Sequence, residues 1–147
     1  MPAIAGFLLL GCISPHPHSV PAYEIRSRLR DVSIGQSIAE VHEIVGDDAV
    51  RMPGRSDARI RSPIRIIDFA GPAGHIRVEV YVVEVWRAEG CSDFHYQDIP
   101  VSYVDGQVVS TQWDYLEWRW RDWGGSIADL RDAQDRFACP PNQATNH

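Results

Sequence analysis

The residues of this chain best suited to chemistry are Asp93, His95 and Asp98, which follow Cys91 closely. Carboxylates and imidazoles bind metals and transfer protons, so this group could form a metal or acid–base site. A polar loop between two strands would contain the same residue types. The chain has no Gly-rich phosphate loop, no His-Glu-x-x-His and no Gly-x-Ser-x-Gly motif. We therefore expect no catalytic residue, metal or cofactor, with a metal-dependent enzyme at residues 93–98 as an alternative.

The first cysteine, Cys12, stands directly after an apolar run and Gly11. Residues 9–12, Leu-Leu-Gly-Cys, resemble the lipobox of bacterial lipoprotein signals. The resemblance implies cleavage before Cys12 and acylation of its thiol and new amino group. Residues 1–11 would then be a signal peptide, and residues 12–22 a Pro- and His-containing tether. The alternative is a buried N-terminal strand or helix, because the run is shorter than the roughly 20 residues of a membrane-spanning helix.

Two further cysteines remain if Cys12 carries lipid, namely Cys91 and Cys139. An exported chain lies in an oxidising compartment, so we expect these two to form a disulfide that closes a loop of about 48 residues. The alternative is a pair of buried thiols. Neither cysteine has the spacing of a redox or zinc motif.

Composition indicates one globular domain, residues 23–147, with its last residues disordered. The chain has 147 residues, 44% of them hydrophobic, and a formal charge of −6, which argues against a nucleic-acid partner. All 14 basic residues are arginines. Four of them gather in the polar segment 47–63, which reads as a solvated loop or as a surface for an anionic partner: Arg51, Arg55, Arg59 and Arg61.

Two short helices are expected before any strand. Residues 23–30 place Ile25 and Leu29 on one face. The second helix begins at Ser37, which forms a capping box with Glu40, and ends at Gly46.

Four strands are expected next, at residues 64–69, 75–87, 99–104 and 107–116, with a loop at 88–98. In the second strand the apolar face changes after Tyr81, which predicts a bulge or cover on both sides. Asp105-Gly106 predicts a tight hairpin between the last two strands. Ser126 caps a final helix with Ile127, Leu130 and Phe137 on its apolar stripe.

The expected fold is therefore α+β, with two short N-terminal helices packed on a roughly four-stranded antiparallel sheet and a C-terminal helix. Residues 32–41, Val-Ser-Ile-Gly-Gln-Ser-Ile-Ala-Glu-Val, with Ile-Val-Gly at 44–46, resemble the helical signature of the SmpA/OmlA (BamE-like) outer-membrane lipoproteins. Residues 103–109 resemble that family's late hairpin. The same helix-pair-plus-sheet unit occurs in β-lactamase-inhibitor-like domains. The resemblance implies a lipid-anchored outer-membrane protein that faces the periplasm and contacts other envelope proteins.

Tryptophan is the other conspicuous residue type. The chain has five, and four of them lie between Trp113 and Trp123. They could cover one face of the sheet under the last helix, or some could remain exposed as anchors for a partner. The candidate partner surface comprises Trp118, Arg119, Trp120 and Trp123.

The sequence thus predicts a non-enzymatic envelope lipoprotein that acts by protein–protein contact and supports outer-membrane assembly or integrity. The alternative is a periplasmic inhibitor or ligand-binding module of the same architecture.

Overall fold

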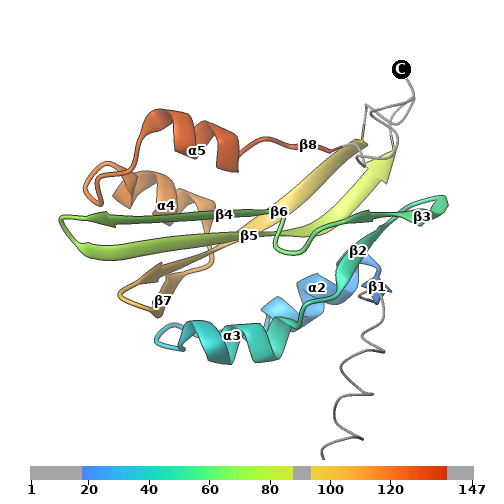
Figure 1. The fold of residues 1–147 in the computed structure, drawn as a ribbon, viewed down its shortest axis with the longest axis horizontal. Coiled ribbons are helices and arrows are strands. Elements are labelled where there is room, and N and C mark those ends of the chain that lie inside the picture. The colour runs from blue at the N-terminus through green and yellow to red at the C-terminus, as the bar shows by residue number, and fades with distance from the viewer. Residues whose placement is uncertain (1–17, 88–93, 139–147) are drawn as a thin grey trace, which may run out of the picture.

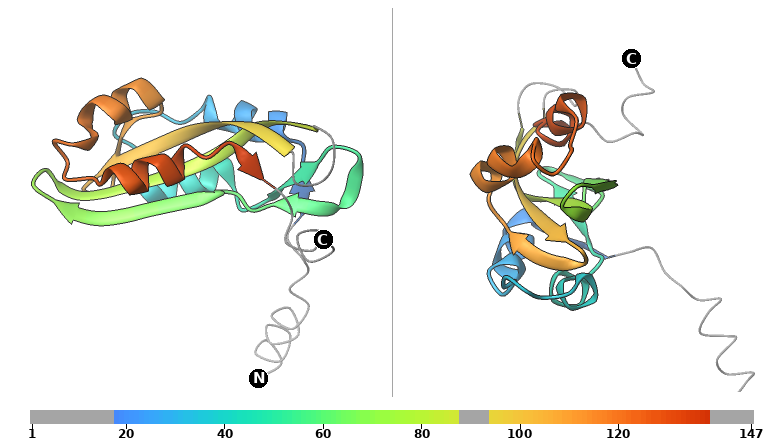
Figure 2. Two further views of the ribbon diagram at one scale, coloured as in Figure 1. Left: turned by 90° about the horizontal axis from the view of Figure 1, so that it is seen from above. Right: turned by 90° about the vertical axis from the view of Figure 1, so that its left-hand side faces the viewer.

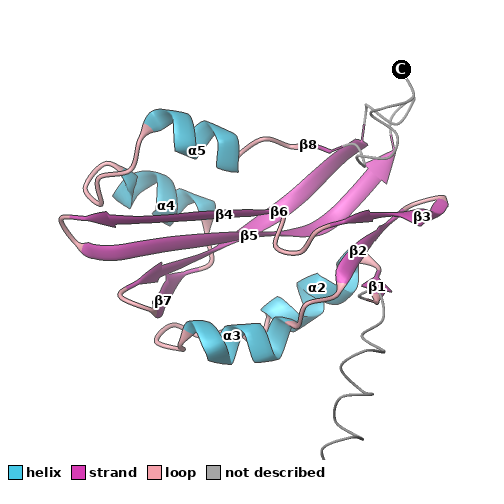
Figure 3. Ribbon diagram, in the orientation of Figure 1, coloured by secondary structure: helices cyan, strands magenta, loops and turns pink. Residues whose placement is uncertain are grey.

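The computed structural model describes residues 18–87 and 94–138. At its centre lies an antiparallel sheet, drawn in magenta in Figure 3. Its strands follow the order β4 (Arg65–Gly71), β5 (Gly74–Arg87), β6 (Phe94–Val104) and β7 (Gln107–Ser110), and β8 (Phe137–Ala138) also pairs with β6. Two helices lie on each face of this sheet (Figures 1 and 2). The α+β class and the four-stranded antiparallel path are as expected.

The first face of the sheet is covered by α2 (Ala22–Leu29) and α3 (Ile38–Val45). The capping box at Ser37 is confirmed, since the Ser37 side chain accepts from the Glu40 amide at 3.1 Å and Glu40 reaches back to the Ser37 amide. Gly46 ends α3 with a φ of 75°, which favours glycine. Ile25 and Val41 are fully buried in this core.

The opposite face is covered by α4 (Trp113–Trp120) and α5 (Ile127–Ala133). Alternation along β5 sends Ile76, Val78 and Val80 into this second core, where they pack with Leu116 of α4. The expected bulge is confirmed between Val82 and Glu84. Because the bulge interrupts the alternation, Val82 packs in the first core, whereas Ile76, Val78 and Val80 pack in the second.

Segment 47–63 is not the solvated loop that its polarity suggested. It forms β2 (Ala49–Met52) and β3 (Arg55–Ile60), which pair antiparallel, and β1 (Ser19–Val20) pairs parallel with β2. Val50 and Met52 alternate with exposed Arg51, and Ala58 and Ile60 alternate with exposed Arg59. This period of two buries one face of the hairpin in the first core.

Three further expectations need correction. The strand expected at 107–116 ends at Ser110, because the three- and four-residue spacing of Trp113, Leu116 and Trp120 suits a helix. The tail therefore has two helices and not one. β6 begins at Phe94, so the expected loop ends earlier. Ile127, expected on the apolar stripe of α5, is 53% exposed, whereas Ala133 is buried. No helix in the described residues is long and apolar enough to cross a bilayer.

Candidate functional site

The tryptophan-rich segment is divided between the core and the surface. Leu116 and Trp120 are four residues apart on α4 and are both buried, at 0% and 2% exposure, and Trp123 just after the helix is also 2% exposed. Trp118 lies on the opposite side of the helix and is 68% exposed. Of the predicted surface residues, Trp120 and Trp123 are therefore core residues, because the helical period turns them toward β5.

Trp120 is fixed by specific contacts. Its Nε1–H donates to the Ser126 carbonyl at 2.7 Å, and its ring meets Phe69 edge-on with centroids 5.4 Å apart. A Cβ at position 125 would lie 2.2 Å from the indole, so only Gly125 allows the chain to pass this close. This packing anchors α4 and the turn into α5, and so fixes the direction in which Trp118 points.

Trp118 is held from two sides while its ring stays accessible. The Arg119 guanidinium lies 5.3 Å from the Trp118 ring centroid, and Tyr115 meets the ring edge-on at 5.8 Å. Arg119 also approaches Asp122 at 4.0 Å, but its Nε has no acceptor among the described residues. Trp118 is therefore an oriented aromatic side chain on the surface.

A hollow of about 450 Å³ lies beside Trp118, between α4 and α5. Ile127 and Arg121 line it and are also exposed. We call Trp118, Arg119, Arg121 and Ile127 the α4–α5 surface. The sequence pattern identified Trp118 and Arg119 but missed Ile127, because an apolar residue at the start of a helix normally indicates core.

The first face of the sheet contains a buried carboxylate, Glu79 of β5, which is 0% exposed. Its Oε2 is 2.6 Å from His42 Nε2 and 2.9 Å from Arg77 Nη2. Its Oε1 accepts from the hydroxyls of Tyr81 at 3.1 Å and Tyr103 at 2.8 Å. Burial alone would raise the pKa of Glu79, but hydrogen bonds from His42, Tyr103 and Arg77 outweigh burial and lower it.

The Glu79 cluster therefore holds a charged carboxylate between α3 and the sheet. Burial raises the pKa of both tyrosines, and the neighbouring Glu79 charge raises it further, so Tyr81 and Tyr103 remain neutral donors. A charged residue in the middle of an apolar strand was the sequence signal for this cluster, but nothing in the sequence identified its partners.

The second buried carboxylate is Asp98 of β6, which the sequence grouped with Asp93 and His95. Asp98 instead accepts from Trp113 Nε1 at 2.9 Å and pairs with Arg136 Nη1, also at 2.9 Å. Burial raises the pKa of Asp98 to about 6, although Arg136 and Trp113 act in the opposite direction. The Arg136 guanidinium also lies 4.7 Å from the Trp113 ring centroid.

His95 and Asp98 do not form a common site. They are three residues apart on one strand and so point to opposite faces, and His95 stacks on Trp86 with centroids 5.9 Å apart. No cluster of three or more potential metal ligands occurs in the described residues. Asp93, the predicted lipid-bearing Cys12 and the predicted Cys91–Cys139 pair lie outside them.

Comparison of this chain with protein-family models, curated proteins and solved structures gives no match.

Proposed function

We propose that this protein is a non-enzymatic envelope lipoprotein that acts by protein–protein contact through the α4–α5 surface. The observation that carries the proposal is Trp118, an oriented indole that is 68% exposed beside a hollow of about 450 Å³. Tryptophan and arginine dominate the energetics of protein interfaces, and exposed aromatic groups next to a concavity favour docking.

The surroundings of the buried carboxylates favour binding over catalysis. Glu79 and Asp98 are the carboxylates with the clearest pKa shifts, and perturbed groups of this kind are the usual candidates for an acid or base. Each accepts hydrogen bonds from side chains that fix helices or strands, such as His42 on α3 and Trp113 on α4. We therefore assign both a structural role.

Attachment to the outer membrane, facing the periplasm, is the second part of the proposal. It rests on the resemblance of residues 9–12 to a lipobox and on the resemblance to SmpA/OmlA lipoproteins. The two N-terminal helices on an antiparallel sheet are compatible with that family's architecture. In this role the covalent lipid on Cys12 holds the domain near the membrane, where contact with envelope proteins supports outer-membrane assembly or integrity.

Photo-crosslinking in intact cells tests the contact. Benzoylphenylalanine at position 118 should capture envelope proteins, whereas the same group at position 34 should not. Ile34 is a matched control because it is 77% exposed and lies in the turn between α2 and α3, the helices on the opposite face of the sheet from α4. Equal capture from both positions, or no capture from position 118, would contradict the proposal. Capture of a single soluble periplasmic enzyme would instead indicate the inhibitor alternative.

Lipid attachment is tested separately by Cys12→Ser. The variant should leave the membrane fraction, and mass spectrometry of the wild-type protein should find an acylated residue 12 at its amino end. Unchanged membrane fractionation of the variant would refute the anchor but leave the surface proposal standing.

A further inference from the structure

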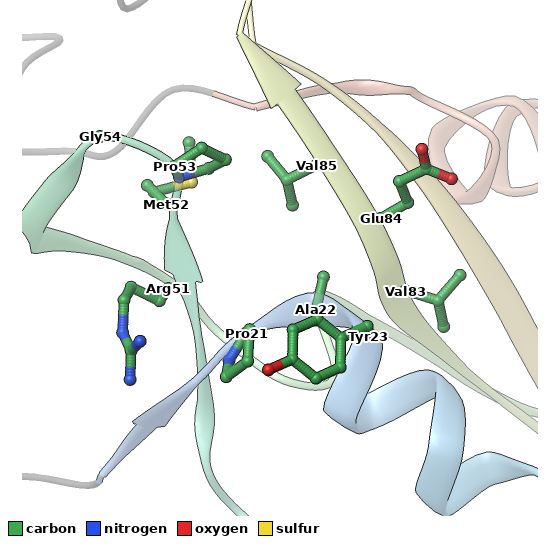
Figure 4. Close-up of a pocket in the computed structure, with 10 residues that line it drawn as sticks. All are labelled: Pro21, Ala22, Tyr23, Arg51, Met52, Pro53, Gly54, Val83, Glu84 and Val85. Carbon is green, nitrogen blue, oxygen red and sulfur yellow. The ribbon is translucent and has the colours of Figure 1, made fainter.

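A second concavity lies on the other side of the molecule, between β2, the start of α2 and the end of β5 (Figure 4). It has a volume of about 440 Å³. Its walls are largely apolar, with Pro21 and Ala22 from the start of α2, Met52 from β2, and Val83 and Val85 from β5. Arg51 and Glu84 stand on opposite walls. We call this the β5 groove.

The β5 groove meets β5 at its edge. Val83, Glu84 and Val85 are consecutive and all line it, whereas consecutive side chains of a strand point to opposite faces of the sheet. The bulge between Val82 and Glu84 interrupts this alternation at Val83, so all three residues reach the groove.

That edge of β5 has no strand partner in the described part of the chain. Pairing with β4 ends at Arg65 and Val80, while pairing with β6 on the other edge continues to Arg87. Figure 1 shows the cause, since β3 turns away from β5 instead of continuing the line of β4. Tyr81, Val82 and Val83 are buried along this edge, whereas Glu84 and Trp86 are exposed, so the accessible part of the edge begins at Glu84. There the backbone N–H and C=O groups of an unpaired edge are open to another strand.

The charge of the groove is asymmetric. Glu84 on the β5 wall is paired with Arg26 at 3.4 Å. Arg51 on the β2 wall donates to the neutral Ser19 carbonyl at 3.0 Å and has no carboxylate partner among the described residues. Arg59 lies directly opposite Arg51 on β3, and Arg61 follows it, both exposed. Arg51 is therefore the cation that the β2 wall presents to the groove, on a protein whose net charge is −6.

We propose that the β5 groove binds an extended, acidic and apolar segment of a partner protein, which adds to the open edge of β5 as a strand. Main-chain hydrogen bonds to residues 84–87 would provide affinity, and alternate apolar side chains would enter the pocket between Met52 and Val85. Acidic side chains between them would face Arg51. This inference rests on the proposed role in protein contact and gives the partner's chemistry at a second surface.

Fluorescence anisotropy with a labelled octapeptide of alternating valine and glutamate tests the proposal on the purified full-length protein. The matched probe replaces each glutamate with lysine. We expect the glutamate peptide to bind about tenfold more tightly than the lysine peptide, with a difference that shrinks at high salt. Hydrogen exchange should slow in residues 84–87 when the glutamate peptide is added.

Two substitutions with matched controls locate the site. Arg51→Glu should weaken binding by about tenfold, whereas Arg30→Glu, the same change on an exposed arginine at the end of α2, should alter it by less than about twofold. Val85→Asp places a charge in the pocket and should abolish binding. Ile66→Asp makes a similar change on β4, an edge strand of the same sheet, and should leave binding intact. A thermal melt of each variant separates unfolding from loss of the site.

Several results would overturn the proposal. The protein could bind neither peptide, or bind both equally well. The third such result is slower hydrogen exchange on β4 together with a loss of peptide binding in Ile66→Asp. If Arg51→Glu removed binding to phosphatidylglycerol vesicles but left peptide binding unchanged, the basic hairpin would be a lipid-facing surface instead. Trp118 does not line this groove, so failure of the crosslinking experiment at position 118 and failure of this one are independent.

Discussion

Glu79 and Asp98 are buried carboxylates on neighbouring strands, and they face opposite sides of the sheet. Both side chains are inaccessible to solvent, and burial is the largest influence on the pKa of each. Even so, the pKa of Glu79 is lowered, whereas that of Asp98 is raised to about 6. The number and charge of the donors must account for this difference, because burial acts in the same direction at both.

Glu79 accepts from four side chains, His42, Arg77, Tyr81 and Tyr103, with Arg77 contributing both Nε and Nη2. Asp98 has two side-chain donors, and one of them, Arg136, also lies against the Trp113 ring. Hydrogen bonds to the charged form offset desolvation only when enough of them converge. The first face of the sheet therefore keeps a charged carboxylate within its apolar core, whereas the carboxylate on the second face holds its proton more tightly.

The largest expected effect comes from removing the charge at Glu79. Glu79→Gln leaves the half-buried Arg77 with Asp68 as its anion and turns an amide N–H₂ toward the other donors in a fully buried site, so it should destabilise the fold by about 4 kcal/mol at pH 7. Urea unfolding measures this loss. Glu84→Gln on the exposed part of the same strand is the control and should cost less than about 0.5 kcal/mol. A loss below about 1 kcal/mol at Glu79 would mean that water reaches the cluster.

The pH dependence of Glu79→Gln has a definite sign. Because the folded pKa of Glu79 is below its ordinary value, its charge stabilises the fold above the unfolded pKa of about 4.5, and this contribution is lost as pH falls toward the lower folded pKa. The stability gap between wild type and variant should therefore narrow in acid.

Asp98→Asn should show the opposite pH dependence. The pKa of Asp98 is about 6 in the folded protein, whereas its ordinary value is 3.8. Between these two pH values Asp98 is protonated in the native state and ionised in the unfolded chain. Between pH 4.5 and pH 7, the free energy of unfolding of the wild type should fall by about 2 kcal/mol relative to that of Asp98→Asn. Urea unfolding of both proteins across this range measures the difference. A gap that does not change with pH would mean that Asp98 is ionised throughout, like Glu79.

The elements around Glu79 could largely be predicted from sequence, because local patterns determine them. Ser37, Glu40 and Gly46 form a cap and a stop whose geometry depends on a few neighbouring residues. Asp105-Gly106 likewise requires two positive φ values, which the structure has at 49° and 80°. The convergence of His42 and Tyr103 on Glu79 could not be predicted, since it depends on the pairing of β5 with β6 and the packing of α3.

The α4–α5 face was harder to predict, because its residues fit two periods. Val109, Thr111, Trp113 and Tyr115 alternate as a strand would, but Trp113, Leu116 and Trp120 also have helical spacing, and the structure follows the latter. The β2–β3 hairpin was similarly missed, because the charged Arg51 and Arg59 stand between apolar residues and make the segment resemble a polar loop. The sequence located Trp118 but could not distinguish it from buried Trp120.

Arg136→Met removes the cation at Asp98 and keeps an apolar side chain beside Trp113. The pKa of Asp98 should rise above about 6, because the charge of Arg136 is the largest of the influences that lower this pKa. The free energy of unfolding should fall by about 1.5 kcal/mol at pH 7. The fall should be smaller at pH 5, because a protonated Asp98 carries no charge for Arg136 to pair with. Carboxyl NMR measures the pKa, and urea unfolding measures the stability. An unchanged pKa would mean that Trp113 alone sets the carboxyl's environment.

The smallest effect should come from His42→Ala, which removes one of the four partners of Glu79. The His42 side chain is 45% exposed, so water can replace its contact, and Arg77, Tyr81 and Tyr103 still bind the carboxylate. The free energy of unfolding, measured with urea at pH 7, should fall by about 1 kcal/mol. Ala39→Gly, at an exposed position of α3, controls for helix propensity. A loss as large as that of Glu79→Gln would show that the four donors act as one unit, and that the stability of the first face cannot be divided among them.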